Sequence, residues 1–125
     1  GKGIVMATTV YDVLKLALKL IDRPQAWSRH AFARDIAGKE VLTEDSSARQ
    51  FSVCGAIERA NMQLRGSGAS LYGAAMEAVR LELVRRGCIQ EKVHVDEWAD
   101  LPSVSHTDVV RILTETMRRR IDTPA

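Results

Sequence analysis

A cysteine near the start of a helix can act as a nucleophile when the helix dipole and a neighbouring histidine lower the pKa of its thiol. Cys54 is the candidate in this sequence, and His30 and His106 are the possible bases. Cys54 lies on the apolar side of an expected helix, about two turns from its start, where the effect of the dipole has largely decayed. We therefore expect Cys54 to be a small buried side chain, and a small cysteine-dependent enzyme is the alternative.

A second group of residues carries the donor atoms that bind zinc, namely Cys88, His94, Asp96 and His106. Their spacing, C-x5-H-x-D for the first three, matches no recurrent metal motif, so we interpret them as scattered polar residues and expect no metal. The segment RGSGASLYG lacks the GK[ST] ending and the preceding strand of a phosphate-binding loop. The sequence therefore indicates no cofactor.

Trp27 and Trp98, with Asp35 and Asp100, are the best candidates for a ligand-binding site. Each indole offers a large apolar ring and an N–H group that seeks an acceptor when it is buried. Each tryptophan is followed along the chain by one of the two aspartates. The carboxylates could instead hold the ends of loops and helices in place, which is the simpler structural interpretation.

The run from Arg118 to Arg120 could contact phosphate groups of a nucleic acid. On a helical wheel, however, Arg120 turns toward the core, and Glu115 is spaced to pair with Arg111 and with Arg118 or Arg119. Neither half of the chain is basic, because residues 1–62 carry nine Lys plus Arg and seven acids, and residues 63–125 carry nine of each. A nucleic-acid partner is therefore not expected, although a weak nucleic-acid-binding helical protein is a further alternative.

The composition predicts one domain without a membrane span. The chain has 125 residues, 46% of them hydrophobic, which is typical of a single core. Lys15 and Lys19 interrupt the apolar run VLKLALKL, far below the roughly 18 residues that a span needs. Two cysteines cannot form a disulfide framework, which favours a cytoplasmic location. Residues 1–5, ahead of Met6, look like an expression remnant, which leaves residues 6–125 as the helical domain.

The first expected helix is apolar over more than half of its circumference, and Thr8 or Thr9 can cap its start. Its polar stripe consists of Asp12, Lys15, Lys19 and Asp22. So wide an apolar surface needs cover on two sides, which predicts either a central helix or a homodimer formed through this helix.

Apolar spacing and boundary signals predict four more helices, so the expected fold is all-α, a compact bundle of about five helices. Their expected bounds are Pro24 to Ala37 with Gly38 as the stop, a start at the capping box of Ser47 and Gln50, a start at Ser67 or Ser70 with an end at Gly87, and a start at Ser105 with Asp108.

Residues 88–98 are the one stretch where alternation competes with helical spacing. Val93 and Val95 predict a short extended segment near residues 89–95. Such a strand has no partner in this chain, so it would pair with its copy in a second protomer or form an ordered loop.

Three blocks of the sequence, WSRHAFARDIAG, FSVCGAIERA and WADLPSVSHTDVVRIL, together resemble a known family. It is a family of small bacterial and phage proteins defined only as a domain of unknown function, number sixty-one ninety-seven, whose blocks run W-x-Q-G-x-x-A-R-D-x-x-G, W-C-x-x-G-A-L-x-R-A and W-N-D-x-P. The resemblance implies a helical domain with Trp27, Asp35, Cys54, Trp98 and Asp100 in corresponding places, and it implies no reaction.

The sequence departs from the family pattern at several positions. Arg29 and His30 replace the Q-G pair, and Ala99 replaces the Asn of the third block, so a polar role for that Asn is lost here. Phe51 stands near the expected aromatic residue, and the spacing from cysteine to glycine is shorter.

These observations favour a non-catalytic binding or interaction module, expected to be a homodimer through the first helix or through residues 88–98. The expected ligand is a protein or a small molecule, bound near Trp27, Asp35, Trp98 and Asp100. No credible set of catalytic residues is visible in the sequence.

Overall fold

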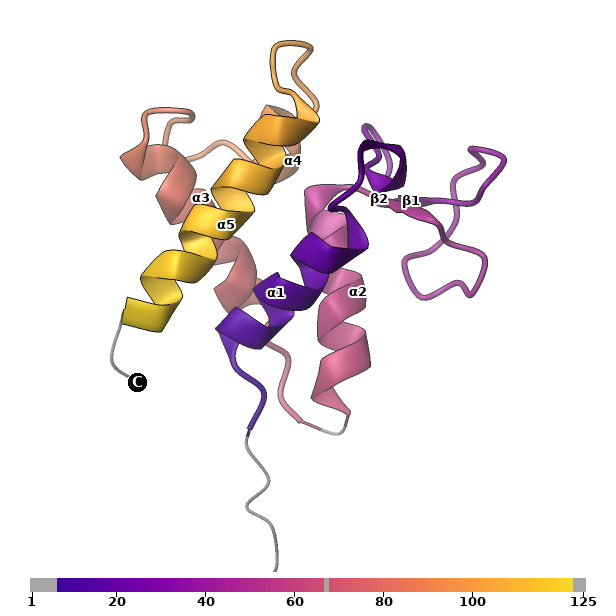
Figure 1. Cartoon of the computed structure of the whole chain (residues 1–125), viewed down its shortest axis with the longest axis horizontal. Coiled ribbons are helices and arrows are strands. Elements are labelled where there is room, and N and C mark those ends of the chain that lie inside the picture. The colour runs from indigo at the N-terminus through magenta and orange to yellow at the C-terminus, as the bar shows by residue number, and fades with distance from the viewer. Residues whose placement is uncertain (1–6, 67, 123–125) are drawn as a thin grey trace, which may run out of the picture.

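The computed structural model describes residues 7–66 and 68–122. For residues 121 and 122 it describes the backbone alone. Residues 1–5, interpreted as an expression remnant, lie outside the described part. The fold is mostly helical and contains five α-helices and one two-stranded sheet within that part, which confirms the predicted fold class (Figure 1). Its elements are α1 (Val10–Leu20), the 3-10 turn η1 (Pro24–Ala26), β1 (Ala33–Arg34), β2 (Gln50–Phe51), α2 (Val53–Arg65), α3 (Tyr72–Arg85), α4 (Val95–Ala99) and α5 (His106–Asp122).

Helix α1 is the central element of the bundle. It packs against α2, α3 and α5, and its residues Val13, Leu14 and Ala17 have no exposed surface. Thr9 caps its start, because the Thr9 hydroxyl accepts the N–H of Asp12 and the Asp12 carboxylate accepts the N–H of Thr9. The neighbouring helices of the same chain therefore cover most of the wide apolar surface of α1. This agrees with the interpretation of α1 as a central helix.

The prediction of a helix from Pro24 to Ala37 is wrong. Only the 3-10 turn at its start is helical, and β1 pairs antiparallel with β2, with Ala33 opposite Phe51. Ala31 and Ala33 are buried and Phe32 between them is exposed, which is the alternation of a strand. Hydrogen bonds to the segment around residue 51 replace the local helical ones, so tertiary pairing overrides the helix propensity of the alanines.

Helix α2 begins six residues after the predicted capping serine. Ser47 instead donates its hydroxyl to Asp45 in a turn, and Ser52 is the N-cap whose hydroxyl accepts the N–H of Gly55. The first turn of α2 lies directly on the backbone of Phe32, so close that a Cβ at position 55 would stand 1.9 Å from the Phe32 carbonyl oxygen. Glycine is required at this position by the close approach.

The second half of the chain follows the predicted order with two differences. Helix α3 begins at Tyr72, after Ser70, and Ser67 lies outside the described residues. The extended segment expected near residues 89–95 is absent from the described structure, since a loop leads into α4, where Val95, Trp98 and Ala99 are buried at helical spacing. The start of α5 is confirmed, because Ser105 and Asp108 exchange capping hydrogen bonds.

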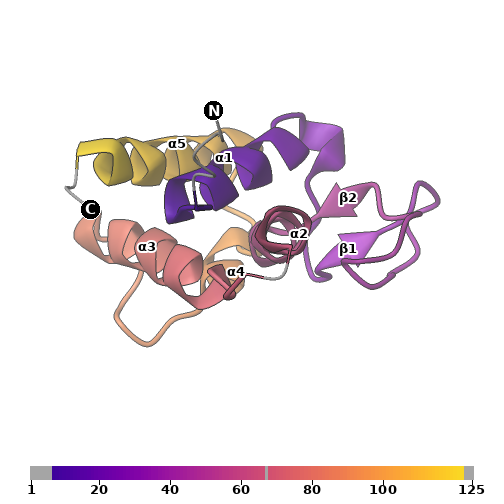
Figure 2. The same ribbon diagram turned by 90° about the horizontal axis from the view of Figure 1, so that it is seen from below.

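The elements divide the molecule into two ends. Figure 2 shows α2 nearly end-on, with the small sheet and its loops on one side and α3 and α5 on the other. Within residues 7–66 and 68–122, no helix has the length and apolar content needed to cross a membrane.

Candidate functional site

An open cleft of about 960 Å³ lies where α2 and α4 meet the loops around the small sheet. It is lined by residues from four parts of the chain: His30–Phe32, Lys39–Asp45, Glu58, and the pair Asp96 and Asp100. The last two side chains stand one helical turn apart at α4, so that both carboxylates line the same side.

Asp100 holds His30 at the edge of this cleft. The backbone N–H of His30 donates to Asp100 Oδ1 at 3.0 Å, and the His30 Nδ1 lies 3.5 Å from Oδ2. His30 has a φ of 66°, a left-handed conformation that costs a non-glycine residue free energy. The Asp100 contacts offset that cost and fix the bend at which the imidazole, 68% exposed, points into solvent beside the cleft.

Asp96 connects α4 to the start of α2. Its Oδ1 accepts the backbone N–H of Cys54 at 3.1 Å, one of the groups that the helix itself leaves without a partner. Burial raises the pKa of Asp96 above its usual value, and the neighbouring charge of Asp100 acts in the same direction. The hydrogen bonds from Cys54 and Ser52 oppose this shift. Asp96 therefore has a structural role at one wall of the cleft.

Cys54 is buried, with 5% of its surface exposed. Burial raises the pKa of its thiol, and the charge of Asp96 raises it further. Asp96 and Tyr72 are the ionisable side chains with the largest effects on the thiol. Because the thiolate is the nucleophilic form, this environment favours the small buried residue expected from the sequence over a nucleophile.

Carboxylates outnumber the basic groups in the cleft. Its lining contains six acidic residues, Glu40, Glu44, Asp45, Glu58, Asp96 and Asp100, against Lys39 and His30. Two apolar side chains of the lining are also exposed, Phe32 at 43% and Leu42 at 69%. Negative charge beside accessible apolar surface can bind a cation that carries an apolar stem.

Arg59 of α2 positions the acidic loop of the cleft. Its guanidinium donates to the carbonyl oxygens of Thr43 at 2.6 Å and Asp45 at 3.0 Å. The Asp45 carboxylate accepts the hydroxyl and backbone N–H of Ser47, and these hydrogen bonds lower its pKa. The loop is therefore fixed to α2, and the Asp45 carboxylate stays ionised at neutral pH.

Trp27 does not line the cleft. The Arg29 guanidinium lies over its ring at 4.6 Å from the centroid, and the His106 ring centroid is 6.0 Å away. Arg29 also donates to the carbonyl oxygens of Leu101 and Val104, so it ties Trp27 to the connection between α4 and α5. The indole N–H is buried and has no hydrogen-bond partner among the described residues.

Trp98 and Asp35 also lie elsewhere. Trp98 is 6% exposed and belongs to the core, with one edge at a smaller hollow beside Arg111. The Asp35 carboxylate accepts the N–H groups of Ala37 and Lys39 and closes a turn. Of the four residues predicted to share a ligand site, Asp100 alone lines the large cleft.

The sequence suggested His30 as a possible base for Cys54 and Asp96 as a possible metal ligand, but it did not place either residue in this cleft. The spacing of Asp96 and Asp100 by four residues was a usable signal, because it places two carboxylates on one side of a helix. The partners of this pair could not be found locally, since Cys54 and His30 are 42 and 70 residues away along the chain.

The four residues with zinc-binding donor types are not assembled into a metal site. His106 Nε2 lies 2.7 Å from the carbonyl oxygen of Ile21, and Cys88 is exposed next to a different hollow from the one that Asp96 lines. Within residues 7–66 and 68–122, no three His, Cys, Asp or Glu side chains are grouped so that they could hold a metal ion.

Comparison with known proteins identifies the family. Residues 6–119 match the model of a family of unknown function, DUF6197. No curated protein and no solved structure matches the chain. The match spans all three sequence blocks and confirms the resemblance, so this chain belongs to the DUF6197 family.

Proposed function

We propose that this protein is a non-catalytic binding module whose acidic cleft takes a positively charged segment of a partner protein. The observation that carries the proposal is the composition of the cleft, in which six carboxylates stand beside the exposed Phe32 and Leu42. Lysine and arginine side chains match both features, since each has a charged head and an apolar stem.

The arrangement of the cleft supports binding more than chemistry. Asp96 and Asp100 are already engaged by backbone N–H groups of Cys54 and His30, so they shape the wall and contribute charge. Glu40 and Glu44 are exposed on the opposite loop and can meet a ligand directly. The alternative of an enzyme that uses Cys54 has less support, because the thiol is buried and its pKa is raised.

The test is calorimetric titration with a short peptide of alternating arginine and leucine, with an alternating glutamate and leucine peptide for comparison. We expect saturable binding of the basic peptide only. A Glu40→Gln/Glu44→Gln variant should bind about tenfold more weakly, because each exposed charge pair contributes about 0.7 kcal/mol.

The matched control is Glu97→Gln, which removes an exposed carboxylate of α4 that does not line the cleft. It should leave the affinity within about twofold of the wild type, since its charge is screened from the ligand. Equal binding of both peptides by the wild type, or equal weakening by the control, would contradict the proposal.

The homodimer and the cytoplasmic location remain predictions. The dimer interface would use the outer side of α1, where the half-buried Leu16 and the 36% exposed Leu64 line a hollow of about 280 Å³. Sedimentation equilibrium of the wild type and a Leu64→Glu variant tests the homodimer, because a charge at position 64 should shift a dimer to monomer. Cell fractionation tests the cytoplasmic location.

A further inference from the structure

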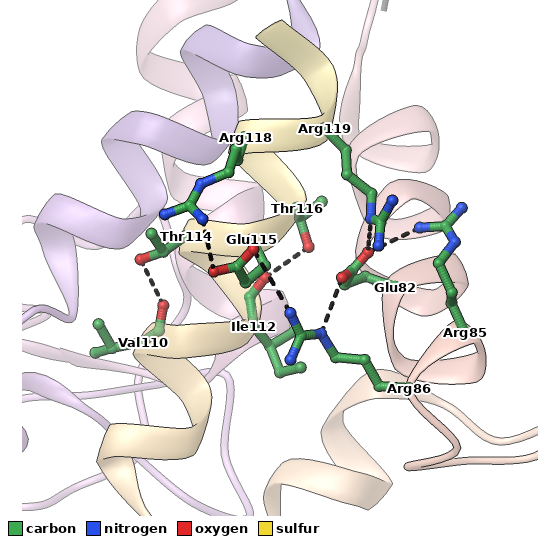
Figure 3. Close-up of polar contacts among 10 residues, drawn as sticks. All are labelled: Glu82, Arg85, Arg86, Val110, Ile112, Thr114, Glu115, Thr116, Arg118 and Arg119. Carbon is green, nitrogen blue, oxygen red and sulfur yellow. Dashed lines mark hydrogen bonds and ion pairs between the residues drawn. The ribbon is translucent and has the colours of Figure 1, made fainter. Parts of the chain in front are cut away.

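Glu82 is a buried carboxylate on the side of the molecule opposite the cleft. It belongs to α3, and its side chain is 1% exposed. Three guanidinium groups donate to its two oxygens: Arg85 at 2.8 Å, Arg86 at 2.9 Å and Arg119 of α5 at 2.5 Å (Figure 3). Burial opposes its ionisation, but the hydrogen bonds from Arg86 and Arg119 outweigh it and hold the pKa of Glu82 below its usual value. The carboxylate is therefore ionised and fixes three cations in one place.

The positive charge of this cluster exceeds its negative charge. A hollow of about 330 Å³ opens beside Glu82 and is lined by Arg85, Arg119 and Arg120, with the 45% exposed Leu81 at its side. The described residues that line the hollow carry three positive charges and one negative charge. Arg120 is exposed here, and the prediction that it turns toward the core is wrong.

The neighbouring basic residues pair with carboxylates that lie outside the hollow. Arg86 and Arg118 both pair with Glu115, as Figure 3 shows, and Arg111 pairs with Asp108. The arginines that line the hollow, Arg85, Arg119 and Arg120, are therefore the basic residues grouped at one place between α3 and α5. A nucleic-acid backbone would need a longer row of unneutralised cations, whereas one doubly charged group would fit.

We propose that the hollow between α3 and α5 binds a phosphate monoester, with Arg85 and Arg120 as its direct donors and Glu82 as the group that positions the guanidinium of Arg85. The described residues of the lining carry a net charge of plus two, which balances the two negative charges of a monoester dianion at neutral pH. Arg85 uses only its Nη1 on Glu82, so its planar group can present further N–H donors toward a phosphate oxygen. The exposed Leu81 provides apolar surface for the group that the phosphate esterifies.

Titrations at constant ionic strength test this site with four probes: inorganic phosphate, phosphoserine, unmodified serine and a phosphoserine peptide. We expect saturable binding of phosphoserine at millimolar concentration or below, and no binding of serine. Binding of phosphoserine and inorganic phosphate indicates a small phosphorylated ligand. Binding of the peptide at least tenfold tighter than phosphoserine indicates a phosphorylated protein.

Substitutions locate the site. Arg85→Gln and Arg120→Gln should each weaken phosphoserine binding at least fivefold, because each removes a charged donor. Arg111 lies on α5, like Arg120, but it pairs with Asp108 away from the hollow. Arg111→Gln should therefore change the affinity less than twofold. Circular dichroism of each variant checks that the fold is retained, and Arg120 is suited to this test because it is exposed.

Three results would overturn the proposal. The first is the absence of phosphoserine and phosphate binding at millimolar concentration. The second is equal weakening by all three substitutions, which indicates only the general charge of the protein. The third is tight binding of a DNA duplex, with a steep salt dependence and no competition by phosphoserine, which identifies a nucleic-acid surface instead.

Discussion

The carbonyl oxygen of Phe32 lies so close to Gly55 that no side chain fits between them, since an added Cβ would stand 1.9 Å from that oxygen. The obstacle is backbone, which cannot rotate away as a flexible side chain can. This contact places the first turn of α2 against the strand that leads into the cleft, so it also sets the position of Cys54 and Glu58.

Gly55→Ala should therefore destabilise the protein by about 3 kcal/mol, because the backbone must shift to admit one methyl group. The measurement is urea unfolding followed by circular dichroism. Gly73→Ala in α3 is the control, because nothing lies within 4 Å of its added Cβ. It should stabilise the protein by up to about 1 kcal/mol. Equal stability of the two variants would show that α2 does not pack on Phe32 as described.

Glu82→Gln should lower the free energy of unfolding by about 3 kcal/mol at pH 7, since it removes the charge that three arginines surround. Glu77→Gln breaks an exposed pair with Arg80 and should cost less than about 1 kcal/mol. The folded pKa of Glu82 lies below its ordinary value of 4.5, so its stabilisation is present above that pH and is lost as the pH falls through the folded pKa. The difference between wild type and Glu82→Gln should shrink on acidification, and a constant difference would refute the assignment.

Asp96 should show the opposite dependence on pH. Its folded pKa is raised above 3.8, so ionisation of Asp96 removes stability as the pH rises from the unfolded value through the folded pKa. Asp96→Asn keeps an acceptor for the N–H of Cys54 and loses this penalty. It should match or exceed the wild type in stability at pH 7, whereas Asp96→Ala should lose about 1 to 2 kcal/mol. Urea unfolding at pH 4 and pH 7 measures both, and a destabilised Asp96→Asn at pH 7 would contradict the direction of the shift.

The two cysteines should differ strongly in their reaction with an alkylating reagent. Cys88 is exposed and should react promptly in the folded protein, while the buried Cys54 should react only through unfolding. Mass spectrometry of the wild type and of Cys88→Ser follows the two sites. Both thiols should react at similar rates in concentrated urea, which is the control. Prompt modification of Cys54 in folded Cys88→Ser would reopen the cysteine-dependent enzyme as an interpretation.

Local patterns in the sequence predicted the parts of the fold whose determinants are close along the chain. The first helix was expected to be capped by Thr8 or Thr9, and the last to start at Ser105 with Asp108; the structure places the caps at Thr9 and at Ser105. The burial of Cys54 followed from its place on an apolar helix side. Of the candidate site, Asp100 was predicted and lines the cleft.

Tertiary structure decided what depends on distant partners. The segment with Ala31 and Ala33 has a helical pattern in the sequence, but in the structure it pairs with the segment of Phe51. A strand is stabilised by hydrogen bonds to another part of the chain, whereas a helix is stabilised by hydrogen bonds within its own segment. Glu82 and Arg119 are separated by 37 residues, and no periodicity links them. Local spacing in the amino-acid sequence thus determined that α1, α2, α3 and α5 are helices, while the short helix α4, the cleft and the arginine cluster arose only when packing brought distant residues together.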